Sequence, residues 1–291
     1  MKLSQYQLQE LEQVASKAAV SAGRYIQSQF DQHYHTQHKA NAHSLASQVV
    51  TEVDIKAQEI ILSYLNDSIR DFDLGLLTEE CTDDASRLEK DYFWCIDPMD
   101  GTLSFTEHRT GYAVSIALIS KDGYPVIGVV NVPDLNHHYR SVRGEGVYLN
   151  DQPFSRPTPV KSNELTVYMD RHPQYERYFD PIAKELASYT SQNDLKLIYH
   201  AGFGAVRNAL GVMNTNMACY FKLPKPTQGS GSIWDYAATY LFFEELGLPV
   251  CNASGTPLNL NSPDTTFMNR VGALYATHQQ ITDLIVGFNF R

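Results

Sequence analysis

The sequence has few cysteines and no long apolar run. Its four cysteines, Cys81, Cys95, Cys219 and Cys251, include no C-x-x-C pair, so neither a zinc motif nor a redox motif is indicated. Such sparse, widely spaced cysteines are typical of a reducing compartment. No run approaches the roughly 20 apolar residues of a membrane-spanning helix, and the first residues lack the apolar core of a signal peptide. We therefore expect a cytoplasmic protein.

Positive charge is also scarce. The 291 residues include 23 Lys and Arg against 33 Asp and Glu, which gives a formal net charge of −10 at pH 7. Nucleic acid polymers and membranes are bound by basic surfaces, so we expect neither as a partner. A small anionic substrate is compatible with this charge, because bound metal cations can reverse the local potential. With 43% hydrophobic residues and no internal repeat, the chain is long enough for one large or two medium domains.

What the chain does contain is acidic residues at the ends of predicted strands. Residues 93–96 form a short apolar run that predicts a strand, and the following Asp-Pro-Met-Asp-Gly-Thr predicts an irregular turn. The proline and the glycine of this turn permit a sharp change of direction, so Asp97, Asp100 and the Met99 carbonyl can converge. Oxygen-only ligands favour Mg²⁺ over zinc. Taken alone, however, these residue types are equally typical of a surface turn.

Two further acidic positions lie elsewhere in the chain. Residues 74–77 predict a second strand, which is followed by Thr-Glu-Glu, so that Glu79 and Glu80 lie at its end. Asp235 follows a tryptophan in the first turn of a predicted helix, where capping of the helix alone would explain it. Neither position identifies a site by itself.

In chain order, the motifs are an acid after a Val-Thr pair, a Glu-Glu pair, Asp-Pro-x-Asp-Gly-Thr and Trp-Asp-x-Ala-Ala. From about residue 49 to residue 238 the chain thereby resembles the inositol monophosphatase superfamily of Mg²⁺-dependent, lithium-sensitive phosphatases. The resemblance implies an α/β (α+β) fold built as a layered α-β-α-β-α sandwich. It also implies hydrolysis of a small phosphorylated metabolite, a phosphate monoester, with two to three Mg²⁺ ions, and assembly as a homodimer.

The metal ligands follow from the resemblance, residue by residue. Glu79, Asp97 and the Met99 carbonyl would hold one Mg²⁺ ion. Asp97, Asp100 and Asp235 would hold a second, so that Asp97 is shared between the two ions. A weaker third ion is implied near Glu79.

The resemblance also assigns residues around the attacking water. A Thr-x-x-Asp spacing that ends at Asp54 is that of a capping box before a predicted helix over residues 55–65, and capping alone would explain it. We expect instead that Asp54 orients Thr102, whose hydroxyl positions the water beside Glu79. Hydrolysis would then proceed by metal-activated water without a covalent intermediate. Glu80 is expected to lie behind the ligands and support them.

Candidate substrate contacts are more dispersed. They are Gly101, Thr102, Arg207 and Asp235, with Lys222 and Lys225 as further cations. Residues 202–205, which include two glycines before a predicted helix, could hold an anion at the helix N-terminus. Solvated surface charge would equally explain any one of the three cations.

Two residues differ from the family pattern. Thr78 precedes the Glu-Glu pair where many members have Gly, and Cys81 follows it where many have Ser; neither is a ligand. Residues 103–105 and the apolar runs after them also resemble the 3′(2′),5′-bisphosphate nucleotidase branch. The substrate therefore stays open between inositol or sugar monophosphates and 3′-phosphoadenosine nucleotides. A fructose-1,6-bisphosphatase and a non-catalytic protein that binds phosphorylated metabolites are further alternatives.

The rest of the chain predicts alternating layers. Residues 5–30 have the apolar spacing of an amphipathic helix that covers a sheet, and residues 112–150 predict an antiparallel meander. Prolines then mark a boundary between an N-terminal metal-site domain, 1–157, and a smaller C-terminal α/β domain, 158–291, which contributes Asp235. Beyond that boundary, strands are predicted over 195–199, 217–221, 249–251 and 273–276, and helices over 173–189, 205–213, 234–246 and 279–286.

A polar, histidine-rich stretch over residues 31–47 predicts a loop near the site. Its histidines are His33, His35, His38 and His43. We do not expect them to bind metal, because a polar loop offers no fixed tetrahedral frame. Lys39 of this loop could approach a substrate phosphate.

Overall fold

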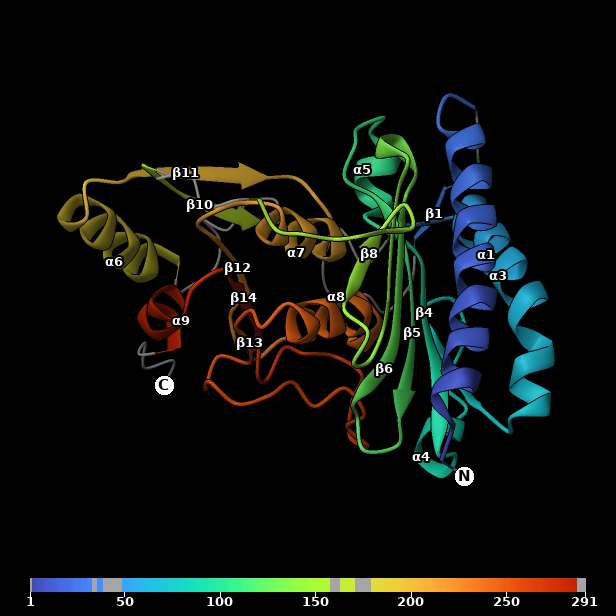
Figure 1. Ribbon diagram of the computed structural model, residues 1–291. Coiled ribbons are helices and arrows are strands. Elements are labelled where there is room, and N and C mark those ends of the chain that lie inside the picture. Colours follow the sequence, from blue (N-terminus) through green and yellow to red (C-terminus); the bar gives the residue numbers. More distant parts are fainter. Residues whose placement is uncertain (1, 33–35, 39–48, 158–162, 171–178, 287–291) are drawn as a thin grey trace.

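The computed structural model describes residues 2–32, 36–38, 49–157, 163–170 and 179–286, and Figure 1 shows its layers edge-on. From right to left, two helices cover a seven-stranded sheet, two more helices separate it from a five-stranded sheet, and a last pair covers the far side. This α-β-α-β-α order confirms the predicted fold class. Within the described ranges, every helix is too short or too polar to span a bilayer.

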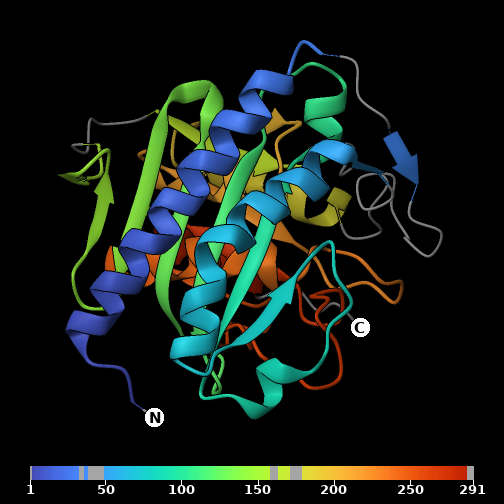
Figure 2. The same ribbon diagram turned by 90° about the vertical axis from the view of Figure 1, so that its right-hand side faces the viewer.

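The outer pair of helices is α1 (Gln5–Gln29) and α3 (Glu52–Asp71), which lie across one face of the larger sheet in Figure 2. The N-cap of α1 is Ser4, whose hydroxyl accepts a hydrogen bond from the Gln7 N–H. Its apolar residues recur every three or four positions and are buried, including Leu11 and Ile26. The predicted amphipathic helix is therefore confirmed.

The larger sheet has the strand order β3-β4-β5-β6-β7-β8-β9. Its strands are β3 (Gly75–Thr78), β4 (Tyr92–Asp100), β5 (Ala113–Ser120), β6 (Pro125–Val132), β7 (His137–Val142), β8 (Val147–Leu149) and β9 (Gln152–Pro153). The short helices α4 (Ser86–Glu89), α5 (Thr102–Thr106) and η1 (Pro133–Leu135) lie in its connections. β3 runs parallel to β4 and the other pairs are antiparallel, so the predicted meander is confirmed.

The smaller sheet has the strand order β11-β10-β12-β14-β13. Its strands are β10 (Glu164–Met169), β11 (Lys196–Ala201), β12 (Ala218–Lys222), β13 (Val250–Cys251) and β14 (Ala273–Ala276). β10 is parallel to both β11 and β12, whereas β14 is antiparallel to its two neighbours. Helices α6 (Phe179–Gln192) and α9 (Gln279–Val286) cover the outer face of this sheet.

Between the sheets lie α7 (Ala205–Met213) and α8 (Ile233–Glu245). Most residues of α8 are buried on all sides, as expected of a helix that has a sheet on either side. The core around α7 and α8 contains residues from both sides of the predicted boundary at 157/158, for example Val130 and Tyr236. The boundary itself falls between β9 and β10, and the division into two domains stays a prediction.

Three predictions about local structure need correction. β10 is a strand where none is predicted from the sequence, although Leu165, Val167 and Met169 alternate along it and are buried. The predicted loop over 31–47 contains a short strand, β1 (Thr36–His38), which pairs with β2 (Val49–Thr51). The turn predicted after residue 96 is the bulged end of β4. Some predictions fall outside the described residues. These are the predictions for His33, His35, Lys39 and His43 of the loop and for residues 173–178 of a predicted helix.

Candidate active site and metal centre

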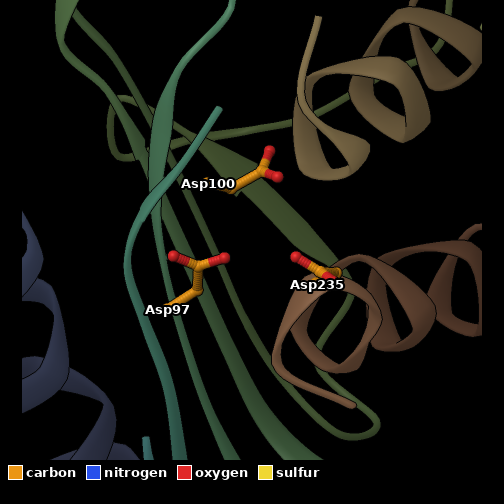
Figure 3. Close-up of side chains that lie close together, drawn as sticks. All are labelled: Asp97, Asp100 and Asp235. Carbon is orange, nitrogen blue, oxygen red and sulfur yellow. The ribbon is translucent and has the colours of Figure 1, made fainter. Parts of the chain in front are cut away.

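Three aspartates converge where the end of β4 faces the first turn of α8 (Figure 3). One carboxylate oxygen from each of Asp97, Asp100 and Asp235 lies within 4.8 Å of the others. Asp97 and Asp100 are buried, with 1% and 6% of their surface exposed. The structure thus brings together the three aspartates that the sequence analysis assigned to one site, and their role as metal ligands stays a prediction.

A bulge in β4 explains how two aspartates three residues apart face the same partner. In a regular strand, residues three apart point to opposite faces of the sheet. Asp97 pairs with Ser115 and Asp100 with Ala113, so β4 carries one extra residue here. Pro98 fits at this irregularity because it has no N–H to donate. The extra residue turns both carboxylates towards Asp235.

Gly101 is required directly after the bulge. It has φ of 88°, and a Cβ atom placed there would lie 2.5 Å from the Gly111 carbonyl oxygen. A larger residue would therefore be strained and would clash. Gly101 thus permits Thr102 to begin α5 beside the two aspartates.

Burial raises the pKa of all three carboxyl groups, and it raises that of Asp235 to about 6. The charge of Glu79 raises the pKa of Asp97 and Asp235 further, and the charge of Asp235 raises that of Asp100. Asp97 accepts the Met99 N–H at 3.0 Å through one oxygen, while its other oxygen is buried and has no hydrogen-bond partner in the described part of the chain. Crowded, desolvated carboxylates with an orphaned oxygen fit a hard divalent cation.

Asp100 is also held by the N-terminus of α7. Its two oxygens accept the Ala205 N–H at 3.0 Å and the Val206 N–H at 2.9 Å. A Cβ atom on Gly204 would overlap with this carboxylate. The segment predicted to hold an anion therefore does so in the structure, and the anion is the Asp100 side chain.

Asp54 and Thr102 meet although 48 residues separate them. Thr102 Oγ1 donates to Asp54 Oδ1 at 2.8 Å and lies 3.0 Å from the Met99 carbonyl oxygen. The other oxygen of Asp54 accepts the N–H and hydroxyl of Thr51 at 2.7 and 2.6 Å, which confirms the capping box. Burial raises the pKa of Asp54 to about 6, although the hydrogen bonds from Thr51 and Thr102 oppose this shift.

Glu79 and Glu80 follow β3 and are half-buried beside the cluster. Thr78 pairs with Ile96, and the Glu79 N–H donates to the Ile96 carbonyl at 3.2 Å, so Glu79 lies next to Asp97 along the sheet. The negative charge of Glu79 raises the pKa of Asp54 as well as those of the three clustered aspartates. The structure thus places Glu79 within electrostatic reach of every other acidic residue of the site.

Two of the three cations predicted to contact substrate, Arg207 and Lys222, form ion pairs with acidic residues. The guanidinium of Arg207 lies 2.7 Å from Asp134, both side chains are buried, and it also stacks over the Phe203 ring. Lys222 forms an ion pair with Asp170, which directly follows β10. Sequence reasoning missed both acids, since nothing in the local sequence links either to its partner. The substrate roles of Arg207 and Gly101 stay predictions.

Lys222 nevertheless lies beside the carboxylate cluster. Burial lowers its pKa to about 8, and the attraction of Asp235 and Asp100 opposes this shift. Lys222 thus places a cation at the edge of the acidic site, on the side of the smaller sheet.

The family model for the inositol monophosphatase family matches residues 7–286. The chain belongs to this family. Its resemblance in sequence extends well beyond the short acidic motifs, because the match covers nearly all of the described helices and strands. The family assignment made from the motifs is therefore confirmed.

Relatives within the family carry different names. The chain is 26% identical to a 3′(2′),5′-bisphosphate nucleotidase 1 of Candida albicans, over 68% of this chain and 60% of that protein. It is 32% identical to inositol monophosphatase 1 of Solanum lycopersicum, over 50% of this chain and 51% of that protein. The chain thus spans little more than half the length of these curated relatives.

The fold is shared over a longer stretch. The crystal structure of extragenic suppressor protein suhB from Bartonella henselae matches with a TM-score of 0.70 at 23% identity, and the match covers 94% of this chain and 95% of that one. At this identity the likeness establishes the fold alone.

Proposed function

We propose that the protein is a Mg²⁺-dependent phosphatase that hydrolyses small phosphate monoesters by direct attack of water. The observation that carries this proposal is the convergence of Asp97, Asp100 and Asp235, with an orphaned Asp97 oxygen, next to the hydrogen-bonded pair of Asp54 and Thr102. Membership in the inositol monophosphatase family supports it. A turn that only shaped the surface would not bury Asp97 and Asp100 against each other and against a half-buried Asp235.

The ligands divide into two overlapping sets. Glu79, Asp97 and the Met99 carbonyl would hold one Mg²⁺, and Asp97, Asp100 and Asp235 would hold the second. Bound Mg²⁺ supplies charge stabilisation for an in-line displacement and lowers the pKa of a coordinated water. The shared position of Asp97 would explain why it is the most buried of the three and why one of its oxygens has no donor among the residues that the structure describes.

Thr102 and Asp54 provide the path for the proton of the water. A hydroxyl group has one hydrogen, which Thr102 donates to Asp54, so the lone pairs of Thr102 can accept a hydrogen bond from water. As the water oxygen bonds to phosphorus and the ester P–O bond breaks, the proton of the water passes to Thr102 and that of Thr102 passes to Asp54. The alcohol oxygen leaves with the electron pair of the broken bond and takes up a proton from solvent. With a pKa of about 6, Asp54 is mostly ionised at neutral pH and can accept it.

A second candidate function is hydrolysis of 3′-phosphoadenosine nucleotides, and Lys222 favours it. This lysine lies beside the acidic cluster, where a second phosphate of a bisphosphate substrate would need a cation. The similarity to a bisphosphate nucleotidase agrees with this reading. If the protein hydrolyses 3′-phosphoadenosine nucleotides, Lys222→Met should lower kcat/KM for a bisphosphate substrate more than for a monophosphate substrate.

Phosphate release tests both candidates. The wild type is compared with Asp97→Asn and with a control, Asp67→Asn, which changes an exposed carboxylate on α3. The substrates are inositol 1-phosphate, fructose 1,6-bisphosphate and adenosine 3′,5′-bisphosphate, each with Mg²⁺ and with a chelator. We expect turnover in the wild type and the control with Mg²⁺ alone, uncompetitive inhibition by Li⁺, and loss of turnover in Asp97→Asn. A wild type that binds these esters and releases no phosphate would instead be a non-catalytic binding protein.

The homodimer and the cytoplasmic location expected from the sequence stay predictions. Sedimentation equilibrium of the purified protein tests the first, and cell fractionation tests the second.

A further inference from the structure

The turn that carries Glu79 and Glu80 is only weakly closed by its main chain. The two glutamates follow Thr78, the last residue of β3, and the Cys81 N–H donates to the Thr78 carbonyl. This is the hydrogen bond of a β-turn with the glutamates at its centre. Its length is 3.5 Å, at the long limit for such a bond. The Glu79 N–H ties the start of the turn to the Ile96 carbonyl of β4 at 3.2 Å, and a further contact that joins the two ends of the turn would keep Glu79 in one geometry.

Gln58 makes that contact. Its amide nitrogen donates to the Cys81 sulfur at 3.1 Å, and its amide oxygen accepts the hydroxyl of Thr78. Gln58 and Thr78 are both buried, with 6% and 3% of their surface exposed, whereas Cys81 is exposed. One glutamine side chain therefore joins the first and last residues of the turn, using both its donor and its acceptor.

Gln58 also connects this turn to the predicted proton acceptor. It lies four residues after Asp54 on α3, so the two side chains project from the same face of the helix one turn apart. Asp54 contacts Thr102 at the end of β4, and Gln58 contacts the turn after β3. A single rigid helix thus fixes the water-positioning pair relative to the Glu-Glu turn.

We propose that Gln58 is a positioning residue that holds Glu79 in its metal-binding geometry through Thr78 and Cys81. The inference rests on the metal site of the proposed function. It also gives a role to the two departures from the family pattern, since Thr78 supplies the hydroxyl and Cys81 the acceptor that a glutamine at this place bridges.

The test measures Mg²⁺ affinity by calorimetric titration of the metal-free protein, together with kcat at saturating Mg²⁺. Gln58→Met keeps the shape of the side chain without its polar groups, and Thr78→Val does the same for the hydroxyl. We expect each variant to weaken Mg²⁺ binding about tenfold, which is the lower end of the loss usually seen when a residue that orients a metal ligand is replaced. We expect kcat at saturating Mg²⁺ to change little. Cys81→Ser retains an acceptor and should bind Mg²⁺ like the wild type.

The matched control is Ser68→Ala on the same helix. The hydroxyl of Ser68 is buried and accepts the Trp94 indole N–H at 3.0 Å, so it ties α3 to β4 away from the acidic cluster. Ser68→Ala should lower the melting temperature without changing Mg²⁺ affinity. If Gln58→Met and Thr78→Val behave like this control, with lower stability and wild-type Mg²⁺ affinity, the proposal is overturned.

Further variants test the role of Gln58 independently of Gln58→Met. Should Gln58→Met fail to fold, Thr78→Val and Cys81→Ala test the same bridge from its other ends, and unchanged Mg²⁺ affinity in both would overturn it. The double variant Gln58→Met/Cys81→Ala should bind Mg²⁺ no more weakly than Gln58→Met, because the sulfur acts through Gln58. A wild type that binds Mg²⁺ but releases no phosphate refutes the proposed function, while the affinity series still decides the role of Gln58.

Discussion

Helices α3 and α8 begin with the same local arrangement. In each, an aspartate is the third helical residue and accepts the main-chain N–H of the N-cap: Asp54 from Thr51 at 2.7 Å and Asp235 from Ser232 at 2.5 Å. Burial raises the pKa of both to about 6. The groups that face them differ. Asp54 accepts hydroxyl groups of Thr51 and Thr102, whereas Asp235 faces the carboxylates of Asp97 and Asp100.

The comparison separates what a cap motif specifies from what the fold adds. Both aspartates satisfy N–H groups at a helix N-terminus, and this function follows from sequence spacing. Donors around Asp54 make it suited to accept a proton, while like charges around Asp235 make it suited to share a cation. We infer that one local motif serves two different tasks because different strands deliver different partners to it.

The largest expected effect follows from Asp235→Asn. Asparagine keeps an oxygen for the Ser232 N–H but removes one negative charge from the cluster. Turnover should fall below detection at ordinary Mg²⁺, whereas the metal-free protein should be no less stable, since a repulsive charge is gone. Phosphate release and thermal unfolding in a chelator measure the two quantities. Near-normal turnover would remove Asp235 from the ligand set.

Asp54→Asn should affect the chemical step and leave the metal in place. The capping oxygen is retained, but an amide cannot accept the proton that Thr102 passes on. We expect kcat to fall by about 10²–10⁴-fold with little change in the Mg²⁺ concentration needed for half-activation. Thr51→Ser, which keeps the hydroxyl, is the matched control. A variant with normal kcat at high Mg²⁺ would show that Asp54 supports the metal site instead.

Thr102→Ala removes the hydroxyl between Asp54 and the water. We expect kcat to fall by about 10²-fold, while KM and Mg²⁺ activation change little, because no metal ligand is lost. Thr102→Ser should recover part of the rate, since it restores the oxygen but lacks the methyl group that limits rotation of the side chain. Steady-state kinetics across Mg²⁺ concentrations measures these quantities. If Thr102 only shapes the turn, Thr102→Ala should raise the Mg²⁺ concentration needed for activity and leave kcat at saturating Mg²⁺ unchanged.

The smallest effect is on the pH dependence of stability without metal. Asp54 and Asp235 have folded pKa values of about 6, above the ordinary value of 3.8. Between these limits the folded state keeps protons that the unfolded chain has released, so the free energy of unfolding falls as pH rises. The slope is at most on the order of 1 kcal/mol per pH unit for each group. Urea unfolding in a chelator from acid to neutral pH measures it.

Mg²⁺ should separate the two aspartates in the same experiment. Excess Mg²⁺ keeps ligands ionised at lower pH, so it should remove the contributions of Asp97, Asp100 and Asp235, whose pKa values are all raised, and leave that of Asp54. In Asp54→Asn, excess Mg²⁺ should therefore abolish the slope, and a slope that persists there would contradict the division of roles.

Much of this architecture can be predicted from the sequence, and the features that could not be predicted have physical reasons. The acidic motifs place Asp97, Asp100 and Asp235 because each lies beside a strand or helix terminus that local periodicity predicts. The bulge in β4 depends on its pairing with β5, and β10 is completed by partners far away in the chain. The bridge made by Gln58 is equally invisible, since a single glutamine in a helix is typical of a solvent-facing position.

Side-by-side calorimetric titration of Mg²⁺ into metal-free wild type, Asp54→Asn and Asp235→Asn tests the central claim most directly. The account predicts wild-type affinity for Asp54→Asn and loss of at least one binding event for Asp235→Asn, although both variants keep their helix caps. Equal loss of affinity in the two variants, or retained binding in Asp235→Asn, would contradict it.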